Sequence, residues 1–238
     1  MVLLETEEVL ALNKPPGVSM ATSGREGKSA EEAVARLLEA CGERADEELR
    51  LVHRLDVGTS GVVLLARNAA AHRALSSAFQ SGGTRKTYRA LVWGRPRPAA
   101  GRIEDPLGRD PRDGRKMKVR AEGKRAVTRY ETLSRLTSVT DLQLFPETGR
   151  THQIRVHLSA RGHPIVGDDL YGGASRWHGV RDATHRRALS GVTHPLLHAE
   201  RVEIPEMGID VRAPLPEDYA KLLALLDLYP LAGGEESQ

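Results

Sequence analysis

The sequence predicts an α+β fold, in which a mixed, largely antiparallel sheet is flanked by helices. Runs with the composition and alternation of strands recur along the chain, and helical patterns separate some of them. Because strands and helices do not alternate one for one, a doubly wound parallel sheet is disfavoured. The 238 residues suffice for one large domain, or for two subdomains around a cleft.

The N-terminal segment predicts one strand and one helix. Residues 7–13 read as a short strand, which the breaker cluster Lys14-Pro15-Pro16-Gly17 ends. Residues 30–41 repeat apolar side chains at helical spacing, and Gly42 follows them as a helix terminator.

The next segment predicts a strand, a helix and a second strand. The apolar run 62–66 is typical of a buried strand. It leads to Asn68, a favoured N-cap residue, which predicts a helix that ends at Gly82-Gly83. Residues 86–93 then alternate as a strand.

Residues 95–124 are rich in Pro, Gly and basic side chains, which predicts exposed loops or a basic hairpin. Paired strands are expected over 125–133 and 140–145. Thr151 can cap a helix that runs through Ala160.

The C-terminal part predicts a loop, a hairpin and a helix. Residues 173–195 are basic and contain glycine, so we expect a loop. Residues 198–204 and 209–212 suggest a hairpin, and a helix is expected after Pro216.

The net charge of +3 is unevenly distributed. Residues 51–199 hold 26 Lys and Arg against 12 Asp and Glu, whereas both ends are acidic. Within residues 51–199, the stretch 107–129 holds nine basic and three acidic side chains. A polyanionic partner fits this pattern, because each phosphate that is neutralised releases counterions. A solvated basic face would give the same charge run.

Composition argues against several classes of protein. The single cysteine, Cys41, rules out an intramolecular disulfide and fits a reducing cytoplasm. No apolar run is long enough to span a bilayer. Neither a phosphate-binding loop nor histidines at metal-ligand spacing occur. We therefore expect no metal, no cofactor and no membrane contact.

The most informative stretch is His53-Arg54-Leu55-Asp56, which stands before a Gly/Ser turn and the buried run 62–66. Loops at strand ends commonly carry catalytic groups. A solvated surface carboxylate is the commoner role of a single Asp. Two later segments favour catalysis, Lys86-Thr87-Tyr88 and Gly149-Arg150-Thr151-His152-Gln153-Ile154-Arg155-Val156-His157.

In this order the three segments resemble the RluA-type pseudouridine synthases, which isomerise uridine to pseudouridine in ribosomal or transfer RNA. Three further blocks extend the resemblance over most of residues 7–215: Asn13–Gly17, Gly162–Asp168 and Leu197–Ala199. It implies one catalytic domain over residues 1–230, in two subdomains around a cleft. The C-terminal residues 231–238 are expected to form a flexible tail.

The resemblance also implies the reacting residues. A carboxylate near the sugar can attack it, stabilise its charge or remove a proton when the glycosidic bond breaks. The motif match makes Asp56 this carboxylate, and Arg155, rather than Arg150, the arginine that holds it ionised through forked hydrogen bonds. Tyr88 is expected to stack on the uracil and relay a proton. Without the resemblance, Tyr88 reads as core.

Other residues are expected to bind RNA. Arg54 is implied to fill the space that the target uridine leaves when it flips out of its stack. Ile154 would close the other side of the base. Arg115, Lys116 and Lys118 would contact phosphates.

We therefore expect a cytoplasmic, monomeric RNA pseudouridine synthase that needs no cofactor. Similarity to the ribosomal members favours large-subunit ribosomal RNA over transfer RNA. Two other classes remain open. A non-catalytic RNA-binding or ribosome assembly protein would have no need of Asp56, Tyr88 and Arg155 together. A base-excising glycosidase usually needs a second carboxylate, and none stands out in the motifs.

Overall fold

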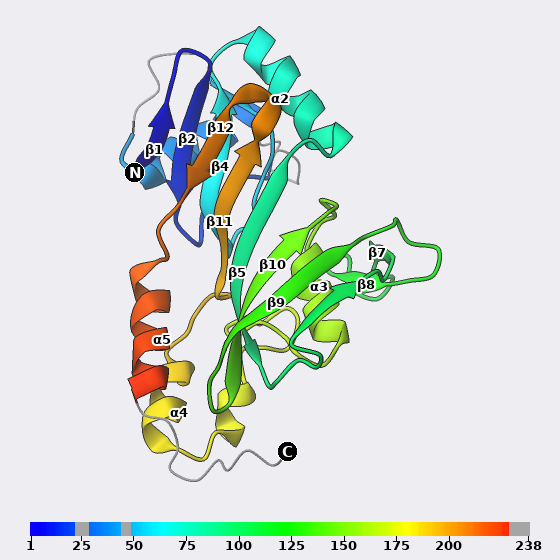
Figure 1. The fold of residues 1–238 in the computed structure, drawn as a ribbon, viewed down its shortest axis with the longest axis vertical. Helices are drawn as coiled ribbons and strands as arrows, with labels where there is room; N and C mark the ends of the chain where they lie inside the picture. The colour runs from blue at the N-terminus through cyan, green and yellow to red at the C-terminus, as the bar shows by residue number, and fades with distance from the viewer. Residues whose placement is uncertain (22–28, 44–48, 229–238) are drawn as a thin grey trace.

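The computed structural model describes residues 1–21, 29–43 and 49–228, and its main element is a ten-stranded sheet (Figure 1). The strands of this sheet are β1 (Val2–Glu5), β2 (Val9–Lys14), β3 (Arg50–Leu51), β4 (Ser60–Ala66), β5 (Arg85–Trp93), β6 (Ala100–Ile103), β9 (Thr128–Arg135), β10 (Val139–Pro146), β11 (Leu197–Ile204) and β12 (Ile209–Arg212). A separate hairpin consists of β7 (Leu107–Arg109) and β8 (Met117–Val119). The helices are α1 (Ala30–Cys41), α2 (Ala69–Ser81), α3 (Gln153–Ala160), α4 (Ala183–Ser190) and α5 (Glu217–Leu228).

The sheet is mixed and largely antiparallel, which confirms the predicted α+β class. Its order is β1-β2-β4-β11-β5-β10-β9-β6, with β12 beside β11 and β3 beside β4. Among the described strands, the parallel pair is β4 with β11, in register at Ser60 and His198. Next to it, Gly61 has a φ of 112°, and a Cβ there would lie 2.2 Å from the carbonyl oxygen of Ala199. A glycine is therefore required where the turn enters β4.

Strand β4 is buried on both faces, which explains its continuous apolar run. Val62 and Leu64 pack on one face in the same cluster as Leu75 of α2. Val63 and Leu65 pack on the other face with residues of α1. Because side chains alternate between the faces of a strand, helices on both sides require apolar residues at every position.

Both predicted N-terminal helices are confirmed, and their ends have identifiable causes. The side chains of Ser29 and Asn68 accept hydrogen bonds from backbone N–H groups in the first turns of α1 and α2. Gly42 and Gly82 follow the two helices in the left-handed conformation that favours glycine.

Several sequence predictions are corrected. Residues 173–195 do not form only a loop, because α4 lies there, capped by Asp182. Its pattern is weak, since only His185 and Leu189 are buried. The short strands β1 and β6 were not predicted either. For residues 95–124, the hairpin alternative is confirmed by β7 and β8. The predicted tail, 231–238, lies outside the described residues.

The start of α3 also differs from the prediction. Its N-cap residue is His152, not Thr151, and no side-chain hydrogen bond caps it. His152 has a φ of 55°, a conformation that non-glycine residues seldom adopt. No helix in the described part of the chain is long and apolar enough to cross a membrane.

Candidate active site

A cleft of about 580 Å³ lies between the turn before β4, the start of β5 and the loop before α3. It brings together five of the residues that the sequence singled out, although they are far apart along the chain. These lining residues are Arg54, Asp56, Tyr88, Ile154 and Arg155.

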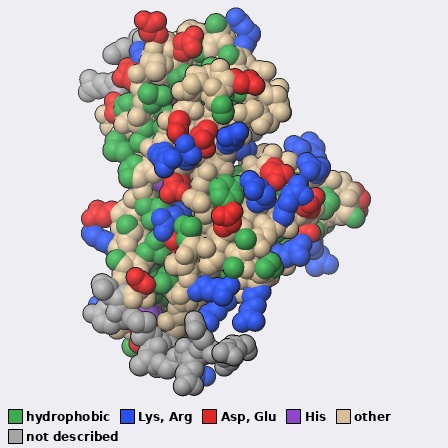
Figure 2. Space-filling model, in the orientation of Figure 1, with side chains coloured by type: hydrophobic (Ala, Val, Ile, Leu, Met, Phe, Trp, Pro, Cys, Tyr) green, Lys and Arg blue, Asp and Glu red, His purple; other side chains and the backbone are tan. Residues whose placement is uncertain are grey.

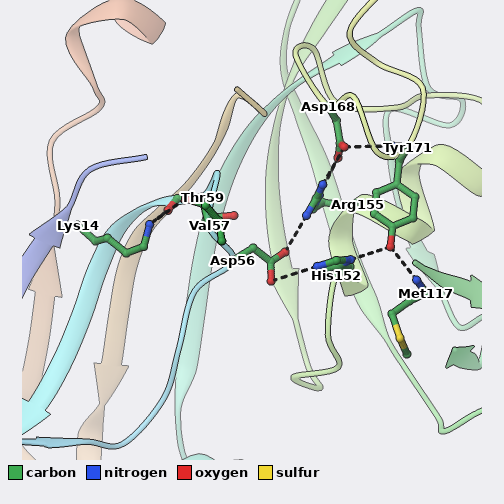
Figure 3. Close-up of polar contacts among 9 residues, drawn as sticks. All are labelled: Lys14, Asp56, Val57, Thr59, Met117, His152, Arg155, Asp168 and Tyr171. Carbon is green, nitrogen blue, oxygen red and sulfur yellow. Dashed lines mark hydrogen bonds and ion pairs between the residues drawn. The ribbon is translucent and has the colours of Figure 1, made fainter. Parts of the chain in front are cut away.

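Lys14 anchors the turn that carries Asp56 (Figure 3). Its ammonium group donates hydrogen bonds to the carbonyl oxygens of Pro15 at 3.0 Å, Val57 at 3.1 Å and Thr59 at 2.8 Å. The side chain is fully buried at the end of β2. Burial lowers the pKa of Lys14 to about 8, although the negative charge of Asp56 opposes this shift. The Lys14 ammonium group thus holds the turn that carries Asp56 in place.

His53 anchors the chain just before the same turn. The backbone N–H of Leu64 donates to His53 Nε2 at 2.9 Å, and the imidazole stacks on Phe79 with ring centroids 4.4 Å apart. Burial, and then the charge of Lys86, lower the pKa of His53 to about 3, so the ring stays neutral. His53 is therefore structural. Arg54, the next residue, is exposed at the mouth of the cleft.

Arg155 makes its forked pair with Asp168, which corrects the prediction of a fork to Asp56. Nε and Nη2 of Arg155 lie 2.7 and 2.9 Å from the two carboxylate oxygens of Asp168. Its third nitrogen, Nη1, lies 3.4 Å from Asp56 Oδ2. Asp168 is fully buried, and a buried carboxylate charge without a partner is strongly destabilising. The two parallel hydrogen bonds from the guanidinium therefore go to Asp168.

Three residues near Arg155 and Asp56 had no predicted role. Asp168 lies in the Gly162–Asp168 block, where an acid within an apolar, glycine-containing run signals a buried ionic partner. Tyr171 follows it and places its ring 5.0 Å from the Arg155 guanidinium carbon. His152 Nε2 lies 4.0 Å from Asp56 Oδ1. The last two contacts depend on tertiary structure and leave no signal in the sequence.

Tyr88 stands on β5, at the centre of the sheet, between Leu144 of β10 and Ala199 of β11. It is half-buried and packs against apolar clusters on both sides, yet it also lines the cleft. Burial, and secondarily the charge of Asp56, raise the pKa of Tyr88 well above its usual range. The phenol is therefore protonated at neutral pH.

The three predicted phosphate contacts lie outside the cleft, on the β7–β8 hairpin. Arg115 is exposed and pairs with Asp113 at 3.0 Å. Lys116 and Lys118 border a second hollow of about 520 Å³ between the hairpin and α3. In Figure 2, Lys and Arg side chains gather, with acids among them, over the surface where Figure 1 places this hairpin.

No group of three or more His, Cys, Asp or Glu side chains within residues 1–21, 29–43 and 49–228 is placed to hold a metal ion. The cleft therefore offers the carboxylate of Asp56, the guanidinium of Arg155 and the imidazole of His152 near it, and the protonated phenol of Tyr88.

Comparisons with known proteins identify similar sequences and a similar fold. The model of the RNA pseudouridylate synthase family matches residues 8–160. The chain is 40% identical to an uncharacterized RNA pseudouridine synthase of Bacillus subtilis, over 93% of this chain and 75% of that protein. It is 38% identical to the ribosomal large subunit pseudouridine synthase D of Xanthomonas campestris, over 94% of this chain and 69% of that protein. The solved structure of human RNA Pseudouridylate Synthase Domain Containing 4 matches with a TM-score of 0.72 and 26% identity, over 95% of this chain and 92% of that chain.

Proposed function

Because this chain belongs to the RNA pseudouridylate synthase family, we propose that it isomerises uridine in a structured RNA and uses Asp56 as the essential carboxylate. One observation carries the assignment of Asp56. Its side chain lines the cleft together with Tyr88, and Arg155 approaches it to 3.4 Å. A nucleoside that enters this cleft would meet the carboxylate and the phenol together.

The reaction rearranges bonds without adding or removing atoms. The bond between N1 of uracil and C1′ of ribose breaks, and the bonding electrons leave with the base. The base turns, C5 bonds to C1′, the proton on C5 is released, and N1 takes up a proton. A carboxylate beside the sugar acts on the electron-poor ribose.

Tyr88 fits a relay of the C5 proton rather than a free phenolate base. Since its raised pKa keeps the hydroxyl protonated, it can accept the C5 proton only while it passes its own proton on. Ile154 is buried in the cleft wall and offers an apolar contact for the base. Arg54, exposed at the mouth, fits the place vacated by a flipped uridine.

The glycosidase alternative has less support. A second free carboxylate would be needed to activate water. Asp168 is buried, with both oxygens bonded to Arg155. Glu147 lines the cleft but pairs with Arg102 and Arg129. Neither is free for that role.

We assign the substrate to large-subunit ribosomal RNA rather than transfer RNA. The likeness to a relative named for the large ribosomal subunit supports this choice. A monomer that works in the cytoplasm belongs to the same proposal. Mapping of pseudouridines in total RNA from cells with and without the gene tests the target, because the missing site identifies the RNA.

Substitution of Asp56 by Asn tests the chemistry. We expect tritium release from RNA labelled at C5 of uridine to fall by roughly a thousandfold or more, with RNA affinity nearly unchanged. Asp210→Asn is the matched control, since Asp210 is an exposed carboxylate paired with Arg201 on β11. Turnover by Asp56→Asn near the wild-type rate would rule out the assignment. Release of free uracil by the wild type would instead indicate a glycosidase, and RNA binding without tritium release a non-catalytic protein.

A further inference from the structure

The backbone at His152 is held in an unusual conformation beside the cleft. Among the described residues, it is the non-glycine residue with a positive φ, at 55°. Strained backbone persists only where its surroundings determine it, and it concentrates at functional sites. The contacts of the His152 side chain explain what determines it here.

A hydroxyl group fixes the His152 ring. Tyr171 Oη lies 2.7 Å from His152 Nδ1, and the backbone N–H of Met117 donates to the same oxygen at 2.9 Å. These are the two hydrogen-bond partners of that hydroxyl among the described residues. Burial raises the pKa of Tyr171, so the hydroxyl keeps its proton. Since Met117 already donates to the oxygen, the hydroxyl can donate to Nδ1, which places the proton of a neutral imidazole on Nε2.

The other ring nitrogen faces Asp56. His152 Nε2 lies 4.0 Å from Oδ1 of Asp56, while Arg155 Nη1 lies 3.4 Å from Oδ2 (Figure 3). Burial lowers the pKa of His152, and the charges of Arg155 and Arg54 add to this, while those of Asp56 and Asp168 oppose it. The ring is therefore neutral at physiological pH, and it presents a donor, not a cation, to the carboxylate.

We propose that His152 is a positioning residue for Asp56, and that Tyr171 sets the tautomer in which it can donate. This inference rests on the proposed function of the cleft. The two oxygens of Asp56 then each have their own donor, His152 for one and Arg155 for the other. The distances of 4.0 and 3.4 Å are longer than those of strong hydrogen bonds, and under this proposal both shorten when substrate fills the cleft, as is common for catalytic hydrogen bonds. Two donors from different directions fix the plane of the carboxylate against the sugar.

Tyr171 supports both donors at once. Its ring lies 5.0 Å from the Arg155 guanidinium carbon, and its backbone N–H donates to Asp168 Oδ1 at 3.1 Å. Its hydroxyl is bound to His152 and to the backbone of β8 at Met117. One residue thus ties the basic hairpin to the two groups that hold Asp56.

The tautomer can be measured directly. In the full chain labelled with ¹⁵N-histidine, two-dimensional spectra at pH 7 distinguish a proton on Nε2 from one on Nδ1, and His152→Gln identifies the signal of His152 by its disappearance. We expect the Nε2–H form. Tyr171→Phe should convert it to a mixture of tautomers, whereas Tyr130→Phe, which removes the hydroxyl bonded to the Pro98 carbonyl, should not. A proton on Nδ1, or a charged ring, in the wild type would overturn the proposal.

Kinetics supply the second readout. We expect Tyr171→Phe to lower the single-turnover rate at saturating RNA about tenfold, with RNA affinity and the rate of Tyr130→Phe unchanged. Removal of the hydroxyl also removes a bond to the neutral ring, so the pKa of His152, read from its ¹⁵N signals, should rise. An unchanged rate and an unchanged pKa of His152 would contradict the proposal. If Tyr171→Phe does not fold, His152→Phe should give the same tenfold decrease, and full activity in that variant would overturn the proposal.

The two proposals fail in different ways. The tautomer is read without RNA, so it stands or falls independently of activity. If the wild type forms no pseudouridine, the proposed function fails while the tautomer result remains. If the wild type is active but His152→Phe and Tyr171→Phe are too, only the positioning role fails.

Discussion

Asp56 and Asp168 share one arginine, and their different surroundings suit them to different roles. Asp168 is fully buried and both of its oxygens are bonded to Arg155. The Asp56 side chain is 23% exposed and has one contact, of 3.4 Å, to the same guanidinium. A buried carboxylate whose two oxygens are both bound to a guanidinium cannot act on a sugar, whereas a loosely held carboxylate in a cleft can. Their surroundings therefore suit Asp168 to a structural role and Asp56 to a reactive one.

The two Asp→Asn variants should therefore differ in how much they lower the free energy of unfolding. Asp168→Asn breaks a buried ion pair and leaves the Arg155 charge without its main partner, so we expect a decrease of roughly 3–5 kcal/mol in the free energy of unfolding. Asp56→Asn should change that free energy by less than about 1 kcal/mol. Denaturant unfolding of both variants measures the difference. Equal decreases would contradict the structural role of Asp168.

For Tyr88, the hydroxyl and the ring can be tested separately. Tyr88→Phe keeps the packing against β10 and β11 but removes the protonated hydroxyl from the cleft. We expect RNA binding to persist and single-turnover product formation to fall roughly 100-fold or more. Tyr88→Ala should also reduce stability, because the ring packs into two apolar clusters. A normal rate in the Phe variant would leave Tyr88 with a stacking or core role only.

At the scale of elements, β2 and β4 hold the turn of Asp56 through Lys14. Burial lowers the pKa of Lys14 from 10.5 to about 8 in the folded protein. Between these two values the unfolded chain binds more protons than the folded one. The Lys14 contribution to stability therefore rises with pH across this window, and is smallest below pH 8.

Comparison with Lys14→Met isolates this effect, since all other titrating groups are shared. The difference in unfolding free energy, wild type minus variant, should grow by up to roughly 3 kcal/mol between pH 7.5 and pH 10. Denaturant titrations at the two pH values measure it. A difference that stays constant would show that Lys14 titrates at its ordinary pKa. The variant should also turn over more slowly at pH 7.5, because the carbonyl oxygens of Val57 and Thr59 no longer share a donor.

The elements that the sequence predicted well are those with local causes. Asn68 caps α2 and Gly42 ends α1 because capping depends on neighbouring residues. Thr151 is the cap of α3 that the same reasoning predicts, but the observed N-cap is His152, whose side chain contacts Tyr171, 19 residues away. Likewise, the motifs placed Arg155 near Asp56, whereas the fork to Asp168 depends on how the loop after α3 returns.

At the scale of the whole molecule, three of the nine basic side chains of the basic segment, residues 107–129, pair with nearby acids. Arg115 pairs with Asp113, Arg120 with Glu122, and Arg129 with Glu147. Within residues 1–21, 29–43 and 49–228, no ion pair joins this segment to the acidic ends of the chain. An alternative role for the segment, as a clamp that holds the acidic ends, therefore has no support in the described contacts.

We propose that the basic hairpin binds RNA and has little part in the chemistry. Arg115, Lys116 and Lys118 lie outside the cleft that holds Asp56 and Tyr88. Replacement of all three by Ser should weaken RNA binding, raise the apparent KM and reduce the slope of log K against log salt by roughly one unit for each phosphate that is no longer bound. The single-turnover rate at saturating RNA should stay near that of the wild type, because Met117, whose backbone N–H binds Tyr171, is unchanged.

A charge-matched control separates direct phosphate binding from net charge. Arg135, Arg187 and Lys221 lie at the end of β9, on α4 and on α5, outside the hairpin. Their replacement by Ser removes the same three charges, and we expect a salt slope close to that of the wild type. If the hairpin variant instead became less thermally stable and kept the wild-type slope, its charges would serve the fold. The hairpin would then have no part in RNA recognition, even though the cleft beside it did.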